Sequence, residues 1–459
     1  MLTGLLAVAG CDRRSSPAAP GTLAPALPPV PHWSWIAGQQ FANSRGNYGL
    51  QGQSTLGITP AGRSDGVAWG DSAGNFWIFG GESEPTADSD IWYNDLWKYS
   101  NGQWTWISGS DRPNQTGKYD TLGVADPASV PGARSGAVGW IDTSNSSLWV
   151  FGGLGLDEHG MSNALNDLWR FSGGQWTWMG GSSSGTQTEP GIYGTLGQAS
   201  AANQPGARRS AASWSDAAGS FWLYGGYGLD SYGHAGYLSD LWQYRDGQWT
   251  WMGGSNRADQ PAVSGTRGTP NTANSPGGRD SATTWVDGSG NFWLFGGATV
   301  PGNRFSALND LWEYSHGKWI WLGGSTEPSE SGTYGTLRQA APANQPGARI
   351  RAAEWTDGSG RFWLFGGDGY DKAGQGGILS DLWCYSDGQW TWIGGPDRSD
   401  QGATYGILNI ASSSNLPGAR YNAFSATVGG RFLLFGGHGN DAVKTLGYLN
   451  DLWFIQPPQ

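Results

Sequence analysis

The sequence predicts an all-β protein, a six-bladed β-propeller of four-stranded antiparallel blades, and three observations support this. The tripeptide Asp-Leu-Trp begins at residues 95, 167, 240, 310, 381 and 451, so its spacing stays between 70 and 73 residues. A Gly-Gly pair and a Trp-x-Trp motif each recur six times at the same spacing. No segment shows a helical period of useful length. Six repeats of short strands are typical of radial packing that buries both faces of each sheet.

Each repeat contains four runs in a fixed order. The first run opens with an Arg after Pro-Gly-Ala or a close variant, at Arg63, Arg134, Arg208, Arg279, Arg349 and Arg420. The second is an aromatic run ending in Gly-Gly, the third carries Asp-Leu-Trp and the fourth carries Trp-x-Trp. The runs are rich in aromatic and β-branched residues and are bounded by Gly, Asn, Asp, Ser or Pro, which indicates strands and turns. The first run, crowded round the axis, is rich in Ala.

The order of these motifs predicts how the ring closes. The first motif in the chain is a fourth strand, Trp33-Ser-Trp35, and the last is a third strand, Asp451 to Phe454. We expect the two to pair, so that blade six combines residues 420–455 with the N-terminal strand. The domains follow: residues 1–11 are a lipoprotein-like signal segment, 12–31 a Pro- and Ala-rich tether, and 32–457 a single propeller.

These residues resemble the kelch family, whose repeats end the second strand in Gly-Gly and place an aromatic on the third strand and a Trp on the fourth. The resemblance covers residues 32 to about 457 and implies a fold like the central domain of galactose oxidase. It implies little about activity. The units are longer than the roughly 50 residues usual for kelch, mostly between the fourth strand and the next first strand.

The large number of Trp residues is explained by the predicted fold, and one of the two Cys residues belongs to an N-terminal motif. Of the 29 Trp residues, all but Trp92 recur at repeat positions, which favours core packing over sugar binding. The two Cys residues are not expected to pair, and Cys384 reads as an incidental strand residue. Leu6-Ala-Val-Ala-Gly-Cys11 resembles the lipobox of bacterial lipoproteins, so Cys11 is a candidate for lipidation. No Lys or Arg precedes the apolar run, which leaves a cytosolic protein with an accidental motif as the alternative.

The net charge and the predicted location limit the classes of partner that the protein is expected to bind. The formal net charge is -11 and the basic residues are not clustered, which argues against nucleic acid or an anionic membrane surface as a partner. We expect membrane contact only through a lipid on Cys11. The predicted location is the exported bacterial cell envelope, facing the periplasm or on the cell surface.

The binding surface is predicted on the face that carries the long connections, from the second to the third strand and from the fourth strand to the next first strand. A Tyr recurs in the latter loops, at Tyr48, Tyr119, Tyr193, Tyr334 and Tyr405, and the loop at 252–278 has none. These tyrosines and the six Arg residues are the candidate ligand-binding residues. The Arg side chains either surround the channel mouth and bind an anion, or each pairs with the Asp of Asp-Leu-Trp.

Metal sites and cofactors are not predicted. After four Gly-Gly pairs comes Gly-x-Asp, at Asp157, Asp230, Asp371 and Asp441. These carboxylates are expected to cap their loops, with calcium as the alternative. Three His residues lie in the same loops at unequal offsets, which argues against zinc.

Two classes of function remain, and no catalytic residue is identified. The first is a non-enzymatic module that holds a protein or glycan at the long-loop face. The second is an enzyme resembling the kelch-type sialic acid mutarotases, which use Arg and Glu near the channel to hold a sugar acid and move a proton. Glu354 supports the second, because other blades place Ala, Gly, Ser or Thr there. We expect Glu354 near the exposed end of its strand. Galactose oxidase chemistry, which the resemblance links to a Tyr crosslinked to a Cys and to His ligands, is rejected, because Cys384 is the candidate thiol and is expected on an outer strand.

Overall fold

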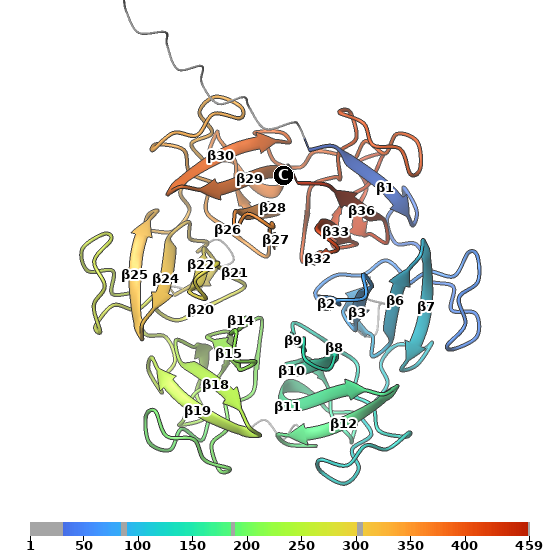
Figure 1. Ribbon diagram of the computed structural model, residues 1–459, viewed down its shortest axis with the longest axis vertical. Coiled ribbons are helices and arrows are strands. Elements are labelled where there is room, and N and C mark those ends of the chain that lie inside the picture. The colour runs from blue at the N-terminus through green and yellow to red at the C-terminus, as the bar shows by residue number, and fades with distance from the viewer. Residues whose placement is uncertain (1–30, 84–89, 185–188, 301–305, 458–459) are drawn as a thin grey trace, which may run out of the picture.

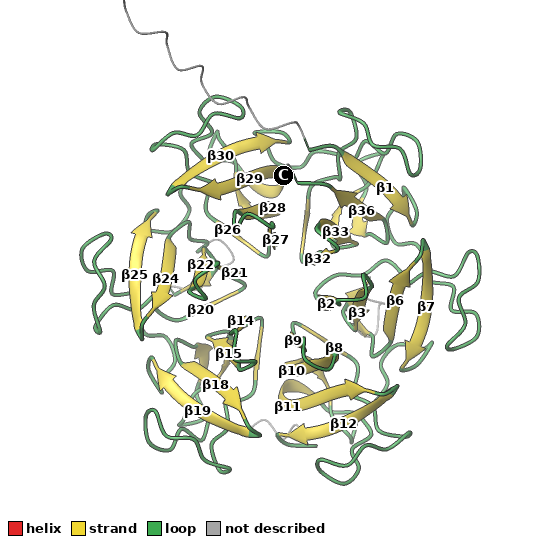
Figure 2. Ribbon diagram, viewed as in Figure 1, coloured by secondary structure: helices red, strands yellow, loops and turns green. Residues whose placement is uncertain are grey.

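The computed structural model describes residues 31–83, 90–184, 189–300 and 306–457, and these residues form strands, turns and loops without an α-helix (Figure 2). Six antiparallel sheets contain the four runs of each repeat, and we number them one to six in chain order. Within the described ranges, no helix is long and apolar enough to span a membrane.

The first three sheets follow the predicted strand order. Sheet one is β2 (Val67–Gly70), β3 (Phe76–Phe79), β6 (Leu96–Ser100) and β7 (Gln103–Ser108). Sheet two is β9 (Val138–Asp142), β10 (Ser147–Leu156), β11 (Ser162–Ser172) and β12 (Gln175–Gly180). Sheet three is β14 (Ala212–Ser215), β15 (Phe221–Tyr224), β18 (Leu241–Arg245) and β19 (Gln248–Gly253).

The remaining three sheets repeat this order. Sheet four is β21 (Thr283–Val286), β22 (Phe292–Phe295), β24 (Leu311–Ser315) and β25 (Lys318–Gly323). Sheet five is β27 (Ala353–Thr356), β28 (Phe362–Tyr370), β29 (Gly376–Ser386) and β30 (Gln389–Gly394). Sheet six is β32 (Phe424–Val428), β33 (Arg431–Phe435), β36 (Leu452–Ile455) and β1 (Trp33–Ala37).

Short strands extend the inner ends of the sheets beyond the Gly-Gly pairs. Some begin at the repeated Arg and pair with the residues that follow Gly-Gly, and others are those residues themselves or the segments that pair with them on the other side. They are β4 (Glu82–Ser83), β5 (Ile91–Trp92), β8 (Arg134–Ser135), β13 (Arg208–Arg209), β16 (Tyr227–Leu229), β17 (Ala235–Tyr237), β20 (Arg279–Asp280), β23 (Ala298–Thr299), β26 (Arg349–Ile350), β31 (Arg420–Tyr421), β34 (His438–Asn440) and β35 (Leu446–Tyr448).

The sheets lie round a central axis, with the first strand of each repeat innermost and the Trp-x-Trp strand at the periphery (Figure 1). This arrangement is consistent with a β-propeller. Backbone hydrogen bonds join neighbouring sheets at the axis, each N–H reaching the carbonyl of the preceding sheet at 2.7 to 3.0 Å. They link Asp65, Gly136, Ser210, Ser281, Arg351 and Asn422 in turn, and Asp65 N–H donates to the Asn422 carbonyl.

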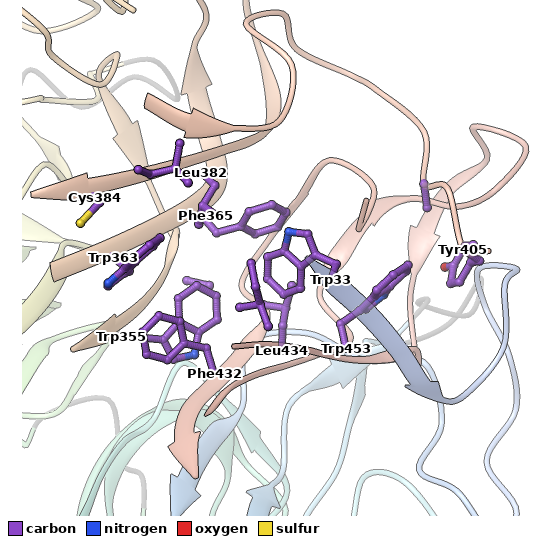
Figure 3. Packing of buried hydrophobic residues seen from close by; sticks show 14 residues of the cluster. Trp33, Trp355, Trp363, Phe365, Leu382, Cys384, Tyr405, Phe432, Leu434 and Trp453 are labelled. Atoms are coloured by element: carbon purple, nitrogen blue, oxygen red, sulfur yellow. The ribbon is translucent and has the colours of Figure 1, made fainter. Parts of the chain in front are cut away.

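The chain ends meet in sheet six. β1 pairs antiparallel with β36, with Trp33 opposite Ile455 and Trp35 opposite Trp453. Trp33 is buried against Trp355 and Phe365 of sheet five, with ring centroids 6.3 Å and 5.2 Å away, and Figure 3 shows it inserted among aromatic and aliphatic side chains of both sheets. The predicted pairing of the first and last strands is therefore present.

The core consists of aromatic layers between neighbouring sheets. In sheets two to five, the Trp near the end of the first strand stacks on a Phe of the next sheet, as Trp214 does on Phe292 at 5.3 Å and Trp285 on Phe362 at 5.4 Å. Aromatic pairs of this kind add roughly 0.5 to 1.5 kcal/mol beyond the apolar area they bury. The repeated Trp residues serve this packing, as the sequence predicted.

The long loops between repeats have a structural reason for part of their length. Each loop returns along the outer strand of the sheet it precedes and hydrogen-bonds to it: Gly123 N–H donates to the Trp178 carbonyl at 2.8 Å, and Gly197 N–H to that of Trp251 at 2.8 Å. An outer strand would otherwise present unpaired backbone groups to other chains. Loop length, which we took as a sign of function, is thus partly explained by edge protection.

Candidate functional site

The six repeated Arg residues do not line the channel mouth with free guanidinium groups. Each forms a two-bond pair with the Asp of Asp-Leu-Trp, at N–O distances of 2.5 to 2.9 Å. All twelve side chains are at most 1% exposed. Each Arg also donates to the carbonyl of the first Gly of Gly-Gly. Of the two alternatives for these residues, the structure shows the pairing within each sheet.

The tyrosines of the long loops complete the same network. The hydroxyls of Tyr48, Tyr119, Tyr193, Tyr334 and Tyr405 donate to Asp95, Asp167, Asp240, Asp381 and Asp451 at 2.6 to 2.7 Å. Burial, and then the charge of the Asp, raise the pKa of these phenols well above its usual value. All eleven candidate residues are therefore engaged in hydrogen bonds inside the fold, although Nε of Arg279 has no partner among the described residues, and a ligand site has to be sought among other side chains.

The fourth loop keeps the backbone of the others without the Tyr. Val263 bridges Ser275 as Thr333 bridges Gln345, and Gly265 has the same φ of 60° as Gly335. Ser264 therefore occupies the Tyr position. In sheet four, Asp310 accepts hydrogen bonds from Arg279 and Trp312, whereas its counterparts also accept one from a tyrosine.

Ser264→Tyr is expected to raise the free energy of unfolding by about 1 to 2 kcal/mol, because it adds a buried hydrogen bond and an aromatic contact with Trp312. Denaturant unfolding followed by circular dichroism measures the change. Ser264→Phe, which supplies the ring without the hydroxyl, is the control and should gain less. Equal or lower stability of Ser264→Tyr would show that the loop does not place this side chain over Asp310.

A cavity of about 270 Å³ lies at the axis on the long-loop face. Its walls come from the starts of the innermost strands and include Asp65, Ser210, Ser281, Arg351 and Asn422. These five residues have φ between 51° and 60°, a left-handed conformation that non-glycine residues adopt at a cost. The hydrogen-bonded ring described above holds them there, and their side chains are presented to the cavity.

The mouth of this cavity departs from the six-fold symmetry of the frame. Arg, Asp-Leu-Trp and Gly-Gly are the same in every sheet, but the positions beside them differ. The residue after the repeated Arg is Ser64, Ser135, Arg209, Asp280, Ile350 or Tyr421, the next is Asp65, Gly136, Ser210, Ser281, Arg351 or Asn422, and the residue after Gly-Gly is Glu82, Leu154, Tyr227, Ala298, Asp368 or His438. We call these eighteen positions the channel-mouth set.

Two arginines of the channel-mouth set lie against aromatic rings. The Arg209 guanidinium carbon is 5.5 Å from the Tyr227 ring centroid, and that of Arg351 is 5.6 Å from Tyr421. Among the described residues, Nε of Arg351 has no hydrogen-bond partner. Cation–π contacts of this kind hold a guanidinium in place while leaving its N–H groups available.

Carboxyl groups of the channel-mouth set face these cations. Burial, and then the charge of Glu82, raise the pKa of Asp65 to about 7, although Arg351 and Arg209 oppose the shift. Burial also raises the pKa of Asp280, again opposed by Arg351 and Arg209. Near neutral pH the mouth therefore combines two arginines with the Asp65 carboxyl, which is close to titrating. Such groups are frequent at binding and catalytic sites.

Glu354 lies in the middle of the central channel. It lines the mouth cavity and also a second cavity of about 480 Å³, which reaches Gly70 and Thr356 at the opposite face. Our expectation of a position near the exposed end of the strand was wrong. β27 is only four residues long and Glu354 pairs with Leu364, so strand alternation directs its side chain into the channel. Burial raises the pKa of Glu354 to about 8.

This carboxyl predicts a pH dependence of stability. Its folded-state pKa of about 8 lies above its ordinary value of 4.5, so the folded protein holds the proton more tightly. Stability from this group is complete below pH 4.5 and is lost as pH rises towards 8. Glu354→Gln should therefore remove about 1 to 2 kcal/mol of the difference between pH 5 and pH 9, allowing for channel water. Denaturant unfolding of the unaltered protein and of Glu354→Gln at pH 5 and pH 9 measures this difference. The same change in stability between the two pH values in both proteins would contradict the prediction.

The remaining sequence candidates have local roles. The Oδ1 atoms of Asp157, Asp230, Asp371 and Asp441 each accept two backbone N–H groups of their own loop at 2.8 to 2.9 Å, so the predicted capping is confirmed. Within the described ranges no cluster of three metal-ligating side chains occurs. Cys384 is buried on β29, where burial raises the pKa of its thiol to about 12. Cys11 lies outside the described residues.

Sequence reasoning missed the channel-mouth set. One signal was available in the alignment of the six repeats, where these positions vary beside invariant residues and several of them are charged. No family model and no curated protein sequence matches the chain. Solved structures do match it, and one of them, described as "Structure of YjhT", has 14% sequence identity and a TM-score of 0.49 over 86% of this chain and 95% of that chain. This similarity is distant.

Proposed function

We propose that the protein is an exported kelch-type propeller of six blades, closed by its N-terminal strand, that binds a ligand at the channel mouth on the long-loop face. The hydrogen-bonded ring at the axis and the pairing of β1 with β36 support six blades and closure. The recurrence of Gly-Gly on the second strand and Trp on the fourth supports the kelch type.

We further propose a lipid anchor on Cys11, and Cys11→Ser should then move the protein from the membrane to the soluble fraction of cells.

The observation that carries the proposal is the contrast between the repeated residues of the six sheets, which do not vary, and the channel-mouth set, which does. The Arg, Gly-Gly and Asp-Leu-Trp residues that form the buried network are identical in all six sheets, as a structural requirement common to every sheet demands. The combination of channel-mouth residues differs from sheet to sheet: Asp65 and Arg351 line the cavity, and Arg209 and Asp280 are near enough to shift the pKa of Asp65. A water-filled channel does not require residues that differ from sheet to sheet, whereas a binding site for a ligand without six-fold symmetry does.

The chemistry of the mouth fits a polar ligand with ring faces and hydrogen-bonding groups, such as a glycan end. Carboxyl groups accept from sugar hydroxyls, and the aromatic run of Tyr421, His438 and Tyr448, with centroids 5.2 Å and 4.8 Å apart, offers faces for stacking. The protein carries a net charge of -11, so Arg209 and Arg351 are local cations on an acidic molecule. A protein partner would use the same groups with the extended hairpins around them.

The test uses variants copied from other sheets, so that the fold tolerates them. Arg209→Ser installs the residue of sheets one and two, and Arg351→Asn installs that of sheet six, where Asn422 has a φ of 51°. A panel of neutral and acidic oligosaccharides, titrated calorimetrically, should show a ligand whose affinity falls at least tenfold in each variant. Arg245→Ser, at an exposed turn, is the matched control and should bind normally. Normal binding by both mouth variants would reject the mouth as the site.

A second function is favoured by Glu354 alone. A carboxyl with a pKa of about 8 in a channel wall, three residues after Arg351, could exchange a proton with a sugar acid held by that arginine. This is the activity that a resemblance to sialic acid mutarotases implies. NMR exchange between the anomers of sialic acid should then accelerate with the protein and lose the acceleration in Glu354→Gln. Absence of acceleration by the unaltered protein would leave the binding function alone.

A further inference from the structure

The seam between sheet six and sheet one differs from the others. At the seam of sheets three and four, Trp222 on the second strand packs against Phe292 at 5.1 Å and Tyr314 at 6.2 Å of the next sheet. At the seam of sheets four and five, Trp293 packs in the same way against Phe362 at 5.1 Å and Tyr385 at 5.7 Å. The register places Leu433 of β33 at the position of these Trp residues, because Leu433 pairs with Phe454 as Trp293 pairs with Glu313.

A second residue has changed together with that Trp. In sheets one, three, four and five the indole N–H donates to an Asp in the adjoining turn, at 2.7 to 3.0 Å. Sheet six has Val428, the last residue of β32, where sheet five has Asp357, the residue directly after β27. Both members of the hydrogen-bonded pair are therefore aliphatic at this seam.

The aromatic receptor for the missing indole is still present. Phe76 and Tyr99 of sheet one correspond to Phe292 and Tyr314 of sheet four. Together with Val428, Leu433 and Phe454 they line a cavity of about 440 Å³. Leu433 replaces the large ring at this seam, and the apolar space left beside Phe76 and Tyr99 is of a kind that small flat molecules can fill.

Arg431 lies at the rim of this cavity and, within the part of the chain that the structure describes, lacks the carboxylate partner that its counterpart in sheet five has. In sheet five, Arg361 pairs with Asp357 at 2.6 Å. Arg431 holds the same place before the Phe in sheet six, but Val428 replaces the carboxylate. Arg431 is exposed and lines the cavity, with its guanidinium carbon 5.2 Å from the Phe454 ring centroid. Among the described residues no ion pair of Arg431 is found.

We propose that this cavity, the seam pocket, binds a small aromatic carboxylate with a ring of indole size. The ring takes the place of the absent Trp between Leu433, Phe76 and Tyr99, and the carboxylate pairs with Arg431. The seam pocket is distinct from the channel mouth and involves no chemical step. Its existence does not depend on the proposed function.

Indole-3-acetate and indole are the probes, observed by calorimetry and by ¹⁹F NMR of their fluorinated forms. Indole-3-acetate should bind the full-length protein more tightly than indole does. Arg431→Gln should weaken indole-3-acetate at least fivefold and leave indole unchanged. Equal effects on both probes, or none, would overturn the role of Arg431.

Filling the pocket tests its location. Leu433→Trp should abolish binding of both probes while the melting temperature stays the same or rises, because the new side chain occupies the aromatic receptor. If that variant folds poorly, Leu433→Trp with Val428→Asp restores the pattern of sheet five and serves the same purpose. Binding that survives in a folded Trp variant, or an unaltered protein that binds neither probe, would overturn the proposal.

Discussion

Arg349→Met is expected to lower the free energy of unfolding by about 3 to 5 kcal/mol, because it leaves the Asp381 carboxylate buried without its counter-charge. Both side chains are inaccessible to solvent and share two hydrogen bonds of 2.7 and 2.8 Å. Burial alone would raise the pKa of Asp381, but the charge of Arg349 and the hydrogen bonds from Arg349, Tyr334 and Trp383 hold it below its usual value. Denaturant unfolding followed by circular dichroism measures the loss.

Two controls separate the buried pair from ion pairs in general. Lys372→Met breaks a solvent-accessible pair with Asp397 between two loops of the same repeat and should cost less than about 1 kcal/mol. The double variant Arg349→Met with Asp381→Leu should cost less than the sum of its single changes, since neither charge then remains buried alone. A cost below about 1 kcal/mol for Arg349→Met would show that the network does not stabilise the sheet.

Removal of β1 is expected to abolish cooperative unfolding of the ring. A chain beginning at residue 38 lacks the strand that pairs with β36, and it also lacks Trp33, which is 4% exposed and packs against sheet five. Loss of a buried Trp side chain alone costs about 3 to 5 kcal/mol. This is a large part of the roughly 5 to 15 kcal/mol that stabilises a typical protein. Calorimetry and limited proteolysis, against a chain beginning at residue 31, measure the effect.

Addition in trans provides the complement to this deletion. A peptide of residues 31–38 can add its backbone hydrogen bonds to the exposed edge of β36 and place Trp33 in its niche. It should restore a cooperative transition to the shortened chain, while the same peptide carrying Trp33→Ala should not. A shortened chain that melts like the longer one would mean that β1 contributes nothing to closure.

The local and repeated features were predictable. Strand order, sheet composition and the pairing of Trp33 with the last strand follow from motifs that recur in every repeat, since a residue needed six times is visible six times. The pairing of Arg with Asp could be named as one of two alternatives, because the first and third strands of each repeat both begin at the same face. Which alternative holds depends on distances across three strands, and the register of the folded sheet supplies them.

The candidate site was less predictable, for a physical reason. Arg209, Asp280 and Arg351 lie about 70 residues apart in sequence in three different sheets, and only the arrangement of the sheets round the axis brings the two arginines near enough to Asp280 to influence its pKa. Glu354 could be singled out as unusual, but its depth in the channel depends on the length of β27. The sequence by itself determined the repeated frame, because each sheet's pairing and packing is local. The tertiary structure alone decided the channel mouth and the seam pocket, because both are formed by the differences between sheets that meet in space.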